Sequence, residues 1–460
     1  MIATYASAAL ICAVSLLVGR AVLLLAGRRE WSWLEPAVGF GAVLTVTGLL
    51  ARAPGHGTSA TLGVALLSAV AAVVVWRSVR PLSGQNRQRT NAGVPWREGV
   101  PVALVVVLVL SIPFAVSGRW GLLGVGFNND LGLHLAWAEW LRSGFGPEAE
   151  PGYPLGPHGL AIATASVPGI GLGQAFIGEI VAIGVMTGLT ALGALRSLTP
   201  ARRTLGAAMV AIPYLAASYY AQAAFKETAA ALLVLAFAIL LATISKQPPE
   251  GWRKRLLFVL PPLALTGGIF FSYSFAGVAW PVAILAFWSL TLPAVRAALR
   301  PRALLRFLLR PLTLLTLAVL AGLALLVTIG PFGFAGAFNK VAASNTYGPV
   351  SALEALGIWP TSNYRLDAEG SVRLPGLAGA ISVLALLAGI AWWTRRREPT
   401  IPVALGATAL LYLASLPTSG DYSQAKALII MAPLAMLVIV RPLLEEFPRL
   451  GRGGGGGGGG

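Results

Sequence analysis

Residues 126–144 contain a carboxylate and an imidazole that fall on one face of a short predicted helix. Asp130 and His134 are one helical turn apart and share a face, whereas Glu139 falls roughly on the opposite face. Gly144 is expected to end this helix. The carboxylate and the imidazole can therefore converge on a bound substrate, as groups that donate and accept protons do.

Each of these residues also has an ordinary structural explanation. One of the residues 128–130 can simply cap the helix, because Asn and Asp side chains accept hydrogen bonds from the free amides of a first turn. A lone histidine such as His134 is more often a hydrogen-bonded interfacial residue, and Glu139 can pair with Arg142 on the helix surface. The chemical interpretation is favoured because the segment is predicted to lie beside the membrane, facing the same compartment as His158.

Two further polar groups stand at the starts of predicted helices: Lys226 with Glu227, and Asp421 with Tyr422 and Lys426. The helix dipole mildly disfavours a cation at such a position, and an anion between the two lysines would resolve the conflict. Free amides and an ammonium group together make a good phosphate site, so a lipid phosphate is the natural candidate. The alternative is that each lysine reaches ordinary headgroups or pairs with the neighbouring carboxylate.

Other polar residues give weaker signals. Glu179 lies within a predicted membrane span, where a carboxylate is a functional candidate unless it is protonated or paired. A long late loop that includes Arg365 mixes amides, aromatic rings and charges, which suits sugars but also any surface loop. The sequence contains no nucleotide-binding motif and no metal-ligand spacing of histidines, so no metal site is predicted.

Apolar helices are the elements expected to position these residues. Of the 460 residues, 56% are hydrophobic and 11% are charged, which leaves too little polar surface for a soluble domain. Many apolar runs lie in windows near the ~20 residues that a helix needs to cross a membrane. We therefore expect an all-α polytopic bundle of about thirteen spans. The predicted spans are 3–27, 34–51, 58–76, 99–118, 172–196, 204–222, 227–245, 256–271, 275–295, 310–330, 375–393, 400–417 and 424–441.

The basic residues set the predicted orientation. Alternating the spans gathers most of the 34 lysines and arginines on one side, which the positive-inside rule assigns to the cytoplasm. The amino terminus is then outside, the carboxyl terminus is cytoplasmic, and the protein lies in the plasma membrane. The net charge of +17 therefore reflects topology and does not predict nucleic-acid binding. Cys12 is the single cysteine, which excludes an internal disulfide.

The spans divide the chain into six regions. Long connections are usually functional, and most of the chemically capable residues fall in or near the two long outer loops. The outer loop 331–374 forms a region by itself, whereas the outer loop 119–171 lies inside the region 99–245. The regions are 1–98 with three helices and a cytoplasmic loop, 99–245 with the first loop, 246–330, the second loop 331–374, the helices of 375–450, and the glycine-rich tail 451–460.

Residues 120–245 resemble the GT-C superfamily of membrane glycosyltransferases. Members of that superfamily have an acidic residue early in the first large outer loop, two short juxtamembrane helices, and a helix that returns to a basic cytoplasmic turn. The composition also resembles that of actinobacterial membrane proteins. The matching features are Asp130 through Gly144, Tyr153-Pro-Leu, a short helix over about 157–168, Gly171, the apolar run to Arg196, and Arg202 with Arg203.

The resemblance implies that Asp130 is the base that deprotonates an acceptor hydroxyl, with His134 as a second catalytic candidate. The sugar would come from a polyprenyl phosphate held outside the membrane by Lys226 and Lys426, and the acceptor would be a cell-envelope glycan, lipid or protein. This chain departs from the commonest pattern, because three spans precede the loop and a single aspartate replaces a frequent acidic pair. The sequence is compatible with a site that holds a divalent cation at Asp130 and with one that does not. It is likewise compatible with a site completed by a partner subunit and with one formed by this chain alone. The remaining candidates for substrate binding are Glu227, His158, Arg365, Asp421 and Tyr422.

Other functions also fit a chain with many spans. A lipid or glycan transporter or flippase would use ionisable residues near the bilayer midplane and broken helices, and Glu179 keeps this alternative open. A polymerase or ligase of lipid-linked polysaccharide would rely on arginine and histidine, for which Arg365 alone is thin support. A non-catalytic subunit of envelope assembly is the last alternative, since a fold does not fix a function.

Overall fold

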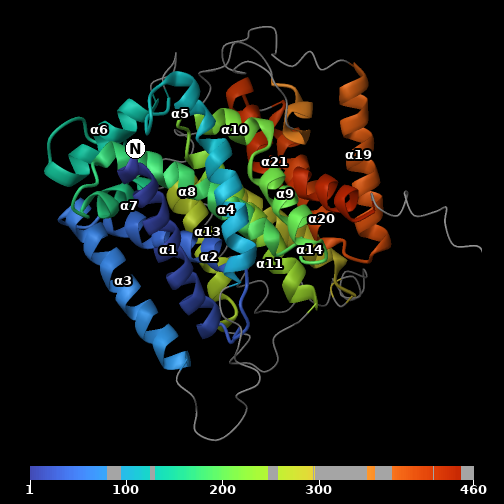
Figure 1. The fold of residues 1–460 in the computed structure, drawn as a ribbon, viewed down its shortest axis with the longest axis horizontal. Helices are drawn as coiled ribbons and strands as arrows, with labels where there is room; N and C mark the ends of the chain where they lie inside the picture. The colour runs from blue at the N-terminus through green and yellow to red at the C-terminus, as the bar shows by residue number, and fades with distance from the viewer. Residues whose placement is uncertain are drawn as a thin grey trace, which may run out of the picture.

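The computed structural model describes residues 1–79, 95–124, 130–246, 257–293, 295, 350–357, 376–417 and 419–446. Every regular element within these ranges is a helix, which confirms the predicted all-α class (Figure 1). The first elements are α1 (Ile2–Leu25), α2 (Glu35–Leu50), α3 (His56–Val79), α4 (Trp96–Leu110), α5 (Ile112–Ser117), α6 (Asp130–Ser143), α7 (Gly156–Ala165), α8 (Leu172–Leu192), α9 (Pro200–Ala211) and α10 (Tyr214–Ala221). The later elements are α11 (Lys226–Lys246), α13 (Leu260–Tyr273), η1 (Phe275–Val278), α14 (Ala279–Thr291), η2 (Ala352–Leu356), α19 (Gly376–Arg395), α20 (Thr400–Ser415) and α21 (Asp421–Glu446).

Six of these helices are long and apolar enough to cross a membrane, or seven if the bent pair α9–α10 counts as one span. Their length and composition indicate a membrane-embedded protein. Each predicted span coincides with a helix or a helix pair, except 310–330, which lies outside the described residues. The six helices are α1, α3, α4 with α5, α8, α11 and α21.

The predicted single span 204–222 is wrong in one respect, because it is two helices. α9 and α10 meet at an angle of 59°. The break falls at Ile212, whose backbone leaves the helical region at φ −128° and ψ 47°, and Pro213 follows it. Proline disfavours helical geometry in the residue before it and cannot donate the next backbone hydrogen bond, which explains the break.

The centre of the bundle depends on close approach between helix backbones. A Cβ atom on Gly39 of α2 would lie 1.7 Å from the carbonyl oxygen of Ser15 in α1. A Cβ on Gly41, also in α2, would lie 2.4 Å from the carbonyl oxygen of Ala264 in α13. These two glycines let α2 lie directly against α1 and α13, as small residues do at helix interfaces in membranes.

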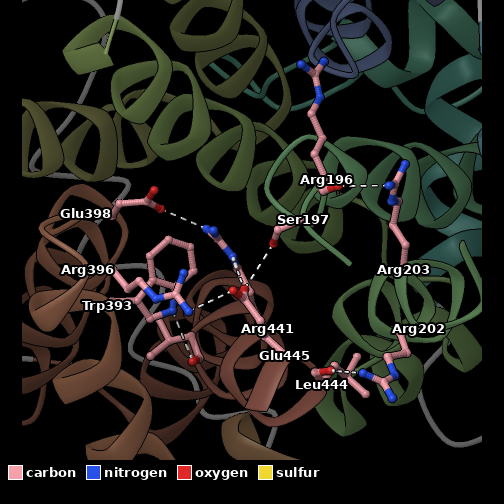
Figure 2. A network of polar contacts seen from close by, with 11 residues as sticks. Arg196, Ser197, Arg202, Arg203, Trp393, Arg396, Glu398, Arg441, Leu444 and Glu445 are labelled. Atoms are coloured by element: carbon pink, nitrogen blue, oxygen red, sulfur yellow. Dashed lines mark hydrogen bonds and ion pairs between the residues drawn. The ribbon is translucent and has the colours of Figure 1, made fainter. Parts of the chain in front are cut away.

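Arginines and glutamates join several helix ends at one end of the bundle, which we call the arginine end (Figure 2). Arg441 of α21 pairs with Glu398 at 3.0 Å, and Glu445 one turn later pairs with Arg396 at 3.0 Å and accepts a hydrogen bond from Ser197 at 3.1 Å. The end of α21 is thereby fastened to the turn between α19 and α20 and to the connection between α8 and α9. Arginines that the sequence assigned to one side of the membrane therefore do lie together.

The helices α6 and α7 lie at the opposite end, which we call the α6 end (Figure 1). α6 ends at Ser143, and Gly144 follows with a φ of +78°, which confirms the predicted stop. α7 packs against α2, α3 and α8, and its residues from Gly156 to Ile162 are buried in the protein. α11 and α21 both begin at this end, so it contains their first turns.

Candidate functional site

A chain of hydrogen-bonded side chains runs across the α6 end. His158 Nε2 of α7 lies 3.3 Å from His134 Nδ1 of α6. His134 Nε2 lies 3.5 Å from the hydroxyl oxygen of Tyr153, which also accepts a hydrogen bond from Lys226 Nζ at the start of α11. An ammonium group, a phenol and two imidazoles from three helices and one loop are therefore in sequential contact.

A second set of contacts adjoins this chain. Lys426 Nζ, in the second turn of α21, lies 3.2 Å from Glu227 Oε1 of α11. Each lysine also lies over a tyrosine ring, Lys226 at 4.7 Å from the Tyr153 centroid and Lys426 at 4.1 Å from the Tyr422 centroid. We call the set His134, Tyr153, His158, Lys226, Glu227, Tyr422 and Lys426 the lysine–histidine cluster.

The local chain geometry explains how α11 presents its first residues. The connection from α10 turns back at Ala223, which adopts a φ of +58°, and the next described helix begins at Lys226. Phe225 is 1% exposed and packs against both His134 and His158, with ring centroids 4.8 and 5.9 Å away. The buried ring of Phe225 thus fixes the helix start, and the two side chains that follow lie at the cluster.

Burial keeps both histidines neutral at physiological pH. His158 is fully buried, and burial followed by the nearby Lys226 ammonium lowers its pKa to about 3. His134 is 6% exposed, and burial, Lys226, His158 and Lys426 hold its pKa well below its usual range. Neutral imidazoles donate from one nitrogen and accept at the other, so they extend the hydrogen-bonded chain without adding charge.

The hydrogen-bond pattern favours one tautomer of each histidine. His158 Nδ1 is buried and has no hydrogen-bond partner among the atoms that the structure describes. A buried acceptor without a partner is more common than a buried donor without one, so we assign the proton to His158 Nε2. That proton points to His134 Nδ1, and the His134 Nε2 proton then points to the Tyr153 oxygen.

Six of the residues singled out from the sequence meet in this cluster. Helix α6 begins at Asp130, whose side chain lies outside the described part of the structure, as does the whole of Arg365. Asp421 is the first residue of α21. The six are His134, His158, Lys226, Glu227, Tyr422 and Lys426.

The structure also bears on the alternatives for these residues. His134 is buried and hydrogen-bonded to Tyr153 and His158, as the structural interpretation of a lone histidine predicted. Lys426 does pair with a carboxylate, but the partner is Glu227 of another helix rather than its own neighbour. Glu139 pairs with Arg142 at 2.6 Å on the surface of α6, as the ordinary interpretation predicted.

Tyr153 is the functional candidate that residue-by-residue reasoning missed. It contacts both halves of the cluster, through its hydroxyl group and through its ring. The sequence marks it only as part of the Tyr153-Pro-Leu stretch of the GT-C resemblance, in a proline-rich segment shortly before His158, and gives it no role. Within the described ranges, no three His, Cys, Asp or Glu side chains gather as a metal site requires.

A small apolar cavity of about 20 Å³ lies at the break between α9 and α10. Its lining includes Ile180, Ile212, Tyr220 and Thr228. Glu179 precedes Ile180 in α8 and is fully buried, and neither carboxylate oxygen has a hydrogen-bond partner among the described atoms. Among the buried carboxyl groups that the structure describes, Glu179 is the one with both oxygens lacking a hydrogen-bond partner.

Comparisons with protein-family models, with curated proteins and with solved structures find no match to this chain. Function has to be argued from the cluster and from the elements that position it.

Proposed function

We propose that the chain is a membrane glycosyltransferase that takes a sugar from a polyprenyl phosphate and transfers it to a hydroxyl group at the α6 end. The observation that supports this most directly is the meeting of Lys226 and Lys426 with a single carboxylate, that of Glu227. The excess positive charge lies near the starts of two helices, where backbone amides also favour anions. A phosphate at the head of a lipid fits such a site.

The proposed reaction needs one base and one site for the leaving group. The acceptor oxygen attacks the anomeric carbon, its proton passes to the Asp130 carboxylate, and the bond between that carbon and the phosphate oxygen breaks. Lys226 and Lys426 stabilise the charge that builds on the departing phosphate, which stays in the membrane through its polyprenyl chain. His134 lies one turn after Asp130 on the same helix, and its Nε2 contacts the Tyr153 hydroxyl group, which in turn contacts Lys226.

The topology is part of the same proposal. About thirteen spans with a cytoplasmic arginine end would place the α6 end outside the plasma membrane, where a cell-envelope glycan, lipid or protein serves as the acceptor. The two short helices after the fourth predicted span and the basic turn after α8 support the likeness to the GT-C superfamily. A divalent cation at Asp130 and a partner subunit are both compatible with it.

The decisive experiment measures sugar transfer by the purified full chain. Wild-type protein and Asp130→Asn are incubated with polyprenyl-phosphate sugars and extracts of envelope acceptors, and the product is detected by radiolabel. We expect Asp130→Asn to lose at least about a hundredfold in rate, as the loss of a general base commonly does. Glu139→Gln, which removes a surface carboxylate from the same helix, is the matched control and should keep wild-type activity. An equally active Asp130→Asn protein would refute the role of Asp130.

The region around Glu179 supports a second candidate, a transporter or flippase of lipid or glycan. Broken helices and ionisable groups inside the membrane are features of such proteins, and here the bent pair α9–α10 and the buried carboxyl group of Glu179 provide them. The test reconstitutes the chain in vesicles and follows the movement of a fluorescent polyprenyl-phosphate sugar between leaflets. Transport by wild type that disappears in Glu179→Gln but persists in Asp130→Asn would establish this candidate over the transferase.

A further inference from the structure

The carboxylate of Glu227 interacts with both lysines of the proposed phosphate site. It is 2% exposed, lies 3.2 Å from Lys426 Nζ, and interacts electrostatically with Lys226 as well. The phenol of Tyr273, at the end of α13, lies close to the same pair. Glu227 thus interacts with two positive charges and is shielded from solvent.

The charges of the lysine–histidine cluster cancel only in part. Lys226 and Lys426 contribute two positive charges, Glu227 contributes one negative charge, and both histidines are neutral. The described side chains of the cluster therefore have a net charge of one positive unit. An anion that binds there brings its own charge within a short distance of both lysines and of the fixed Glu227 carboxylate.

This charge distinguishes two kinds of lipid phosphate. A lipid phosphate with a sugar attached is a diester and has one negative charge. Once the sugar has left, the lipid phosphate is a monoester with about 1.5 to 2 negative charges at neutral pH, because its second pKa is about 6. The Glu227 carboxylate repels the monoester about twice as strongly as the diester at the same distance, because the repulsion grows with the charge of the ligand.

We propose that Glu227 makes the site selective for a singly charged phosphodiester lipid and against the doubly charged monoester that remains after sugar transfer. The inference rests on the proposed function, since it takes the lysines to be the phosphate site. Glu227 would favour binding of the loaded donor and release of the spent carrier from the same lysines. A purely structural role for Glu227, holding Lys426 in place, predicts the opposite effect of neutralising it.

The test measures the binding of two soluble probes to the full chain in detergent. Farnesyl phosphate is the monoester, farnesyl methyl phosphate is the diester, and affinities are measured by calorimetry at about pH 8, above the second phosphate pKa of about 6. Glu227→Gln keeps the shape of the side chain and removes its charge. We expect it to bind the monoester about tenfold more tightly than wild type does, with a smaller gain for the diester, because the removed repulsion grows with ligand charge.

Two further variants control for charge and for shape. Glu227→Asp keeps the negative charge and should keep the wild-type preference for the diester. Glu139→Gln removes an exposed carboxylate at the same end of the molecule and should change neither affinity, because surface charges are screened. The thermal unfolding of each variant is recorded beside the binding, so that a gain of affinity is measured on folded protein.

The outcomes separate this inference from the proposed function. Weaker binding of both probes by Glu227→Gln, or an equal change for both, would overturn the inference and leave the phosphate site in place. Wild-type protein that binds neither probe would overturn the phosphate site itself, and the inference with it.

Discussion

The Tyr153 phenol contacts both an imidazole and an ammonium group of the cluster. Its hydroxyl oxygen lies between His134 Nε2 and Lys226 Nζ, and its ring lies beneath the same lysine. Removal of the Tyr153 hydroxyl group leaves the buried His134 Nε2 without its hydrogen-bond partner, which costs about 1–3 kcal/mol. Tyr153→Phe keeps the ring, so its effect isolates the hydroxyl group.

We predict that Tyr153→Phe lowers the free energy of unfolding by about 1–3 kcal/mol and weakens the binding of farnesyl methyl phosphate several-fold. Stability falls because two polar neighbours lose a partner, and affinity falls because Lys226 is no longer held at one position. Denaturant unfolding and calorimetry measure the two effects. Tyr412→Phe, on α20, is the control and should match wild type in binding. A Tyr153→Phe protein with unchanged affinity would show that the hydroxyl group does not orient Lys226.

The histidines predict a loss of stability in acid. The pKa of His158 falls from an unfolded value near 6.5 to about 3, so between these values the unfolded chain binds a proton that the folded chain excludes. The contribution of His158 to the free energy of unfolding is fully present above about pH 6.5 and is lost as the pH falls toward 3. Between pH 7 and pH 5 the loss is about 2 kcal/mol for each such histidine. The unfolding temperature of His158→Gln should therefore fall less steeply than that of wild type as the pH is lowered. Parallel curves would contradict a neutral, buried His158.

Most cluster residues could be found from the sequence because a charged or titratable group is conspicuous in an apolar chain. Lys226, Glu227 and Lys426 stood out in this way, and so did His134 and His158. Their partners could not be found, because the contact between Glu227 and Lys426 joins segments far apart in sequence and is set by the packing of α11 on α21. Tyr153 could not be found because tyrosine is ordinary beside a membrane.

At the scale of elements, long apolar runs predicted the positions of the described helices, since the length of an apolar run can be counted in the sequence. The packing of those helices was not predictable in the same way. The two glycines of α2 that contact α1 and α13 lie among many others, because the chain contains 54 glycines. Only the structure distinguishes a glycine at a backbone contact from one that faces open space.

We therefore predict opposite effects for two glycine substitutions. Gly39→Ala places a Cβ 1.7 Å from the Ser15 carbonyl oxygen, so α1 and α2 must separate, at a cost of about 1–3 kcal/mol or more. Gly406→Ala in α20 meets nothing within 4 Å and should be neutral or slightly stabilising, because alanine favours helix more than glycine does. Thermal unfolding in detergent compares the two. Equal stability of both variants would contradict the close contact between α1 and α2.

At the scale of the whole molecule, the lysine–histidine cluster and the arginine network lie at opposite ends of the same helices. α21 has Lys426 near its start and Arg441 near its end, so one helix connects both ends. If the positive-inside rule holds, the arginine end faces the cytoplasm and the cluster faces outside. Sugar transfer outside the membrane and selection against the spent lipid carrier both require this orientation.

The lone cysteine makes the orientation directly measurable. In a Cys12→Ser background, Ser143→Cys places a thiol at the exposed end of α6, and Thr199→Cys places one at the exposed start of α9, at the arginine end. We predict that a membrane-impermeant maleimide labels intact cells at position 143 and labels position 199 only after the membrane is opened. The reverse pattern would place the cluster in the cytoplasm, where sugar donors are activated by nucleotides rather than by polyprenyl phosphate. It would contradict a transferase that works outside the membrane.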